Sequence, residues 1–123
     1  MTEPDGFEAR VAAITADREQ GAAALARQAL EALASSAREA EAADAETLVR
    51  DLIRRAYRLA GSRPSMAPLA VLPRRFADAI ATLAPTDLPA MRERAAAAAE
   101  DLAERSRRAG AEAAQRLATR IHR

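Results

Sequence analysis

The fold of this chain is decided by residues 21–33, which read Gly21-Ala22-Ala23-Ala24-Leu25-Ala26-Arg27-Gln28-Ala29-Leu30-Glu31-Ala32-Leu33. The apolar positions 22, 25, 26, 29, 30 and 33 recur with the three- and four-residue spacing of a single helix face. Alanine, which dominates the stretch, is the best helix former and loses no side-chain entropy. The stretch therefore predicts an amphipathic helix over residues 21–40 with one side buried.

The rest of the chain predicts four more helices and no sheet. The 123 residues include 36 alanines and only 2% aromatic residues, and the few strand-favouring residues never alternate along the chain. We predict five helices over residues 5–17, 21–40, 44–61, 65–83 and 86–119, with caps at Asp44, Ser65 and Thr86. Short loops favour a mainly antiparallel, all-α bundle. At a rise of about 1.5 Å per residue, the last helix should be about 45–50 Å long and overhang the others.

Composition excludes several classes of function. The chain carries 19 arginines and no lysine, and its net charge is only +1 with the two signs mixed, which disfavours a nucleic-acid binder. It lacks cysteine, and its one histidine is His122 near the end. We therefore predict no catalytic dyad, no metal site and no cofactor.

The chain has neither the apolar run of a membrane span nor the N-terminal pattern of a secreted protein. No apolar run approaches the roughly 18–20 residues that span a bilayer, and the acidic N-terminus lacks a signal-peptide pattern. A membrane-surface helix is disfavoured because such helices usually present large apolar side chains. We expect a cytoplasmic protein that does not bind membranes.

Two segments place an arginine beside a predicted helix start: Asp17-Arg18-Glu19-Gln20-Gly21-Ala22 and Ser62-Arg63-Pro64-Ser65. Unpaired N–H groups at a helix start favour an anion, and a guanidinium binds phosphate through two parallel hydrogen bonds. In the alternative interpretation, Arg63 is a surface arginine that pairs with a nearby carboxylate such as Glu46 or Asp51, and Gly21 is only a helix-junction glycine.

These segments carry a family resemblance. Asp17-Arg18-Glu19-Gln20-Gly21-Ala22-Ala23-Ala24-Leu25-Ala26-Arg27-Gln28-Ala29-Leu30 resembles the opening of the translation initiation factor 2B family. That superfamily includes the regulatory α, β and δ subunits, ribose-1,5-bisphosphate isomerase and methylthioribose-1-phosphate isomerase. Ser62-Arg63-Pro64-Ser65-Met66-Ala67-Pro68-Leu69-Ala70 resembles its second N-terminal signature. The resemblance covers nearly the whole chain, but only the N-terminal helical domain of the family.

The resemblance implies a phosphate site. In the isomerases, the glycine-alanine helix start and the arginine-proline turn help to hold a substrate phosphate, which designates Gly21, Ala22 and Arg63, with Arg18 as a helper. After that turn the family usually carries asparagines, where this chain has Val71, Pro73 and Arg74.

The resemblance also implies what the chain lacks. The catalytic cysteine and aspartate of the family belong to a Rossmann-like C-terminal domain. We expect residues 1–123 to form a single helical domain without that Rossmann-like part, ending about where its first strand would begin.

Three hypotheses on function follow. The first is a non-catalytic interaction or regulatory module that self-associates or binds a separate protein through the long alanine-faced helix. The second is a sensor of a sugar phosphate or a nucleotide phosphate. The third is the N-terminal half of a split sugar-phosphate isomerase, completed by a separate Rossmann-like protein. On its own, the chain is not expected to be an enzyme.

Overall fold

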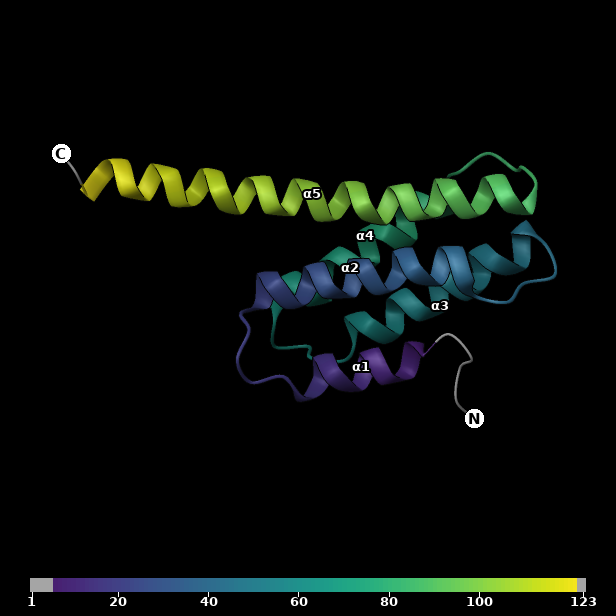
Figure 1. Cartoon of the computed structure of the whole chain (residues 1–123), viewed down its shortest axis with the longest axis horizontal. Helices are drawn as coiled ribbons and strands as arrows, with labels where there is room; N and C mark the ends of the chain where they lie inside the picture. The colour runs from purple at the N-terminus through teal and green to yellow at the C-terminus, as the bar shows by residue number, and fades with distance from the viewer. Residues whose placement is uncertain (1–5, 122–123) are drawn as a thin grey trace.

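The chain folds into five helices in the computed structural model, which describes the backbone of residues 6–121 and the side chains of residues 6–118. The helices are α1 (Phe7–Ala16), α2 (Ala22–Glu39), α3 (Ala45–Ala60), α4 (Ala67–Ala81) and α5 (Leu88–Ile121). Figure 1 shows consecutive helices running in roughly opposite directions, with α5 projecting beyond the others at one end. Residues 6–121 contain no strand, so the predicted all-helical, mainly antiparallel bundle is confirmed.

The helix that begins at residue 22 is the centre of the bundle. α2 packs against each of the other four helices. Its side chains Leu25, Leu30 and Leu33 are fully buried, and burying a leucine contributes roughly 1.5–3 kcal/mol. Ala26 and Ala29 are buried as completely, and such small side chains allow a neighbouring helix to approach closely.

The start of α3 confirms the predicted cap. The Asp44 carboxylate accepts a hydrogen bond of 2.8 Å from the backbone N–H of Thr47. This bond lowers the pKa of Asp44 below its ordinary value, because it stabilises the ionised carboxylate. One of the four N–H groups left without a partner at a helix start is thereby satisfied.

The starts of α4 and α5 differ from the prediction. Ser65 is not a cap: the backbone N–H of Met66 turns back to the carbonyl of Arg63 (3.0 Å), and α4 begins only after Met66. Thr86 is not the cap of α5 either. The carboxylate of Asp87 accepts from the N–H of Ala90 at 2.8 Å, because aspartate is the stronger capping residue.

The buried face of α5 agrees only in part with the apolar stripe that residue spacing predicts, which is Leu88, Met91, Ala95, Ala98, Leu102 and Leu117. Its buried positions are Met91, Ala95, Ala96, Ala99 and Ala103. Ala98 and Leu102 are only half-buried, and Leu117 is 59% exposed. Five consecutive alanines present the same side chain on every face, so residue spacing alone does not orient this helix. The burial of α5 ends at Ala103, and its continuation is the projecting segment of Figure 1.

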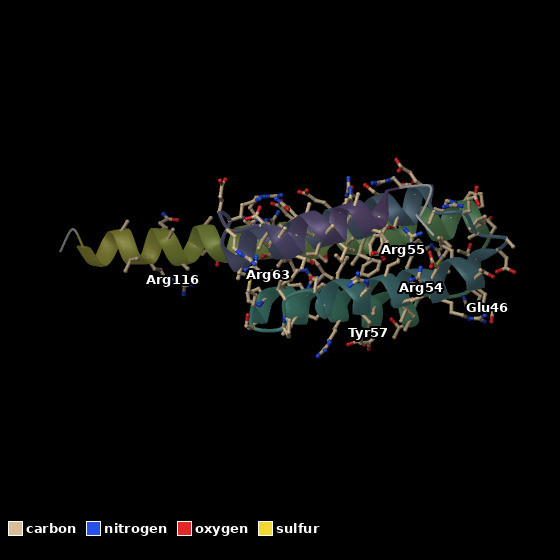
Figure 2. The ribbon with its side chains drawn as sticks, turned by 90° about the horizontal axis from the view of Figure 1, so that it is seen from below. Glu46, Arg54, Arg55, Tyr57, Arg63 and Arg116 are labelled. Carbon is tan, nitrogen blue, oxygen red and sulfur yellow. The ribbon has the colours of Figure 1, made fainter. Side chains whose placement is uncertain are left out.

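One arginine is part of the core. Arg55 on α3 is only 3% exposed. Its Nη1 donates to the hydroxyl of Ser36 on α2 at 2.9 Å, its Nε lies 2.8 Å from a carboxylate oxygen of Asp51, and its guanidinium lies 4.9 Å from the centre of the Phe7 ring on α1. In Figure 2 Arg55 lies between α3 and α1, so one guanidinium links three helices.

Candidate functional site

The two arginine segments meet at one end of the bundle. The connector between α1 and α2 and the connector between α3 and α4 lie together at the end from which α5 projects (Figure 1). Arg63 reaches across, and its Nη1 donates to the backbone carbonyl of Asp17 at 2.5 Å. Segments 46 residues apart in sequence are thereby joined at one place.

The α1–α2 connector is held by Asp17. Its carboxylate accepts hydrogen bonds from the backbone N–H of Gln20 (2.8 Å) and of Glu19 (2.9 Å), and from the Gln20 side chain (3.0 Å). These bonds, and then the positive charge of Arg63, lower the pKa of Asp17 below its ordinary value. The connector therefore keeps a defined shape with its aspartate ionised at neutral pH.

The start of α2 is open. Gly21 occupies the capping position with extended backbone, and no side chain caps the first N–H groups of the helix. A Cβ added at Gly21 would meet nothing within 4 Å, and the residue is exposed. Ala22 begins the helix and is half-buried. Gly21 is thus not required for close packing within the described residues; its small size leaves space in front of the helix start.

The two arginines of the predicted site differ in burial: Arg63 is partly buried, whereas Arg18 is exposed. Arg63 is partly buried and fixed by the carbonyl of Asp17. Its expected partners Glu46 and Asp51 pair with other arginines, and the carboxylate whose pKa its charge lowers is that of Asp17. Arg18 is exposed, and its Nη1 lies 3.4 Å from the carbonyls of Thr15 and Asp17.

The structure brings Arg63 to the connector that leads into α2, with Arg18 anchored on the same connector. Both arginines contact the carbonyl of Asp17, four residues before Gly21, and the ionised carboxylate of Asp17 lies on the same connector. The uncapped N–H groups at the start of α2 favour an anion. The assignment of Gly21, Ala22, Arg63 and Arg18 to phosphate binding stays a prediction.

A second feature is the exposed half of α5. From residue 107 to residue 118 every side chain is exposed. Just before this segment, α2 and α5 flank a surface groove of about 590 Å³, whose floor includes Leu30, Ala34 and Ala103. Arg38 of α2 crosses to Glu100 of α5 with two hydrogen bonds of 3.0 and 3.1 Å.

Two contacts that hold the helices and the connectors together were not predicted from the sequence: those of the buried Arg55 and the bond from Arg63 to Asp17. The burial of Arg55 had a signal in the sequence, because residue 55 stands three residues after Leu52 and four before Leu59 and therefore lies on the apolar face of α3. The bond from Arg63 to the carbonyl of Asp17 could not be predicted, because every residue has a backbone carbonyl and the sequence does not show which one accepts.

Neither a metal site nor a membrane-spanning helix is found among the residues that the structure describes. No group of three or more acidic, histidine or cysteine side chains is placed to hold a metal ion; His122 lies outside the described residues. No helix there is both long enough and apolar enough to cross a bilayer.

The fold and the site define a class: a small helical domain that presents an arginine beside an open helix start and carries a projecting C-terminal helix. A family model described as the Initiation factor 2 subunit family matches residues 18–123. The chain belongs to this family, and the match corresponds to its N-terminal helical domain. The family includes isomerases and non-enzymatic factors. No curated protein matches the chain significantly.

Proposed function

We propose that the chain is a non-catalytic interaction module that packs the exposed half of α5 against a protein surface, either a second copy of itself or a separately encoded partner. The single observation that carries this proposal is the exposure of every side chain from residue 107 to residue 118 of a continuous helix. We propose no catalytic residue within the chain. Isomerase activity would require the catalytic groups of a separate domain.

Residues 107–118 of α5 gain no packing energy while their side chains stay exposed. The packed half of α5 supplies the helix nucleus, so this segment is held only by helix propagation, which is close to neutral per residue in water. Its interior contains Gly110, which costs about 1 kcal/mol relative to alanine. A protein surface that covers Ala113 and Leu117 would supply the missing stabilisation.

The test is the association state of the full chain and of the double variant Ala113→Glu/Leu117→Glu, measured by sedimentation over a range of concentrations. A carboxylate at each position opposes burial but is compatible with an exposed helix. We expect self-association, or a complex with a purified partner, that this variant abolishes. Ala97→Glu, an exposed position on the packed half of α5, is the matched control. A chain that stays monomeric, and whose partner complexes survive the double variant, refutes the proposal.

A second function is favoured by one observation: Arg63 is fixed at the connector leading into a helix start that no side chain caps. This arrangement supports binding of a sugar phosphate or nucleotide phosphate at Gly21, Ala22 and Arg63. Calorimetric titration with ribose-1,5-bisphosphate, ribose 5-phosphate and AMP tests it. We expect binding that weakens with salt and is lost in Arg63→Ala but not in Arg10→Ala, an exposed arginine of α1. Absence of heat with all three ligands argues against the sensor.

A further inference from the structure

We propose that the chain forms a closed dimer in which residues 108–121 of α5, the arm, lie in the groove between α2 and α5 of a second copy. This inference rests on the proposed interaction function, which it deepens by naming the partner and the surface that the arm covers. Three features carry it: the apolar face of the arm, the opposite charges of the groove and the arm, and the position of the groove.

The arm continues the buried face of α5. Ala96 and Ala103 are buried in the bundle, and Gly110 and Leu117 follow at the same seven-residue interval. Seven residues are nearly two helical turns, so these four positions lie along one side of α5. Gly110 and Leu117 are exposed, because the arm extends past the start of α2 (Figure 1). The arm therefore carries an uncovered extension of the face that packs within the bundle.

The groove and the arm carry opposite charge. Two arginines and four glutamates line the groove, a net charge of −2: Glu31, Arg38, Glu39, Glu100, Glu104 and Arg107. Arg38 pairs with Glu100, and Arg107 pairs with Glu104. Glu31 and Glu39, both exposed on α2, form no hydrogen bond or ion pair with any described residue.

The arm supplies the matching positive charge. Residues 108–121 contain three arginines and one glutamate, a net charge of +2. Figure 2 shows one of these arginines, Arg116, on the arm and clear of the other helices. Arg116 is exposed and forms no ion pair with any described residue. Opposite charges on two surfaces of one chain favour contact between copies of that chain.

The groove lies where the arm leaves the bundle. Along α5 its lining runs from Ala99 to Arg107, about 12 Å, and residues 108–118 span about 15 Å. A two-fold axis perpendicular to α5 beside Arg107 therefore places each arm over the groove of the other copy, antiparallel to that copy's α5. One rotation covers both grooves, so the assembly closes at two copies.

The groove floor is suited to the side chains of the arm. Ala34, Ala99 and Ala103 line the groove, and the arm has alanine or glycine at residues 109–111, 113, 114 and 118. Small side chains on both helices allow their axes to approach to about 8–10 Å. Charge, size and position thus all match within this chain, which selects a second copy as the occupant.

The test is sedimentation equilibrium of the full chain and of two charge-reversed variants, at low and at high salt. The groove variant is Glu31→Arg/Glu39→Arg, and the arm variant is Arg108→Glu/Arg116→Glu; all four positions are exposed. Each replacement changes the charge by two, so the groove becomes net positive and the arm net negative. Glu104 keeps Arg107 as its partner when Arg108 is replaced.

Two matched controls carry the same changes of charge at exposed positions outside the groove and the arm. Glu41→Arg/Asp78→Arg matches the groove variant, and Arg74→Glu/Arg75→Glu matches the arm variant. Circular dichroism of every variant checks that the helices are kept.

We expect the chain to dimerise with a dissociation constant that rises with salt. Each charge-reversed variant should raise that constant at least about tenfold, because like charges then meet twice in the dimer, and the controls should not. An equimolar mixture of the groove variant and the arm variant should restore the dimer. In that mixed dimer the reversed groove meets the reversed arm, and the unchanged groove meets the unchanged arm.

A chain that stays monomeric, an assembly larger than a dimer, or a mixture that stays monomeric overturns the inference. Charge-reversed variants that dimerise as tightly as the unmodified chain also overturn it. Failure of the proposed function is measured separately, with Ala113→Glu/Leu117→Glu. If that variant abolishes association while the groove and arm variants leave it unchanged, the proposed function stands and this inference fails.

Discussion

Replacement of the buried Arg55 by alanine should strongly destabilise the bundle. The side chain contributes a hydrogen bond to Ser36, an ion pair with Asp51 and a cation–π contact with Phe7. Removing one member of a buried ion pair typically costs about 3–5 kcal/mol. Here Asp51 retains Arg54 at 2.7 Å, which reduces that penalty. We therefore expect a loss of about 2–4 kcal/mol, against a total stability of roughly 6–18 kcal/mol for a domain of this size.

Two further variants separate the causes of this loss. Arg55→Met fills a similar volume with an apolar side chain and leaves no cavity, so about half of the loss or less is expected. Arg54→Ala removes a neighbouring arginine that bonds the same Asp51 but is 54% exposed, and should cost at most about 1 kcal/mol.

The assay is urea unfolding followed by circular dichroism at one fixed protein concentration. With a slope of about 2 kcal/mol per molar urea, the middle of the usual range, Arg55→Ala should lower the midpoint by about 1–2 M. The reasoning is refuted if Arg55→Ala and Arg54→Ala shift the midpoint equally, because burial would then contribute nothing. It is also refuted if Arg55→Met destabilises as much as Arg55→Ala.

Three further predictions follow from single contacts. Gly110→Ala should stabilise α5 by about 0.5–1 kcal/mol, because alanine is the better helix former and a Cβ there meets nothing within 4 Å. Slower amide hydrogen exchange over residues 105–118 would confirm this, and unchanged exchange would contradict it. The pKa of Asp17 is lowered, so its contribution to stability is complete above the ordinary value of 3.8 and is lost as pH falls through the lower native pKa. The amide signals of Glu19 and Gln20 should therefore titrate below pH 3.8, and a titration above it opposes the assignment. The hydrogen bond from Arg38 lowers the pKa of Glu100, so Arg38→Gln should raise that pKa toward its ordinary value of 4.5. Titration of the carboxylates followed by NMR measures this, and an unchanged pKa would rule out the bond in solution.

Much of the architecture was predictable because it depends on local spacing. The apolar period of residues 22–33 and the capping aspartate at residue 44 act within a few residues of themselves, so the sequence identifies α2 and the start of α3. The residues of the predicted phosphate site could also be named in advance, since each stands at a helix end. What they bind remains a prediction.

The sequence by itself determined that residues 6–121 are all-helical, that they form five helices, and that the last helix is longer than the bundle. Only the tertiary structure decided which face of the alanine-rich α5 is buried and that burial stops at Ala103. It alone placed Arg55 inside and Arg63 on the carbonyl of Asp17. The alanines of α5 and the backbone carbonyls carry no local preference, so packing between distant segments selects which of them are used. Spacing places Arg55 on the apolar face of α3, but its partners on α1 and α2 come together only in the folded bundle.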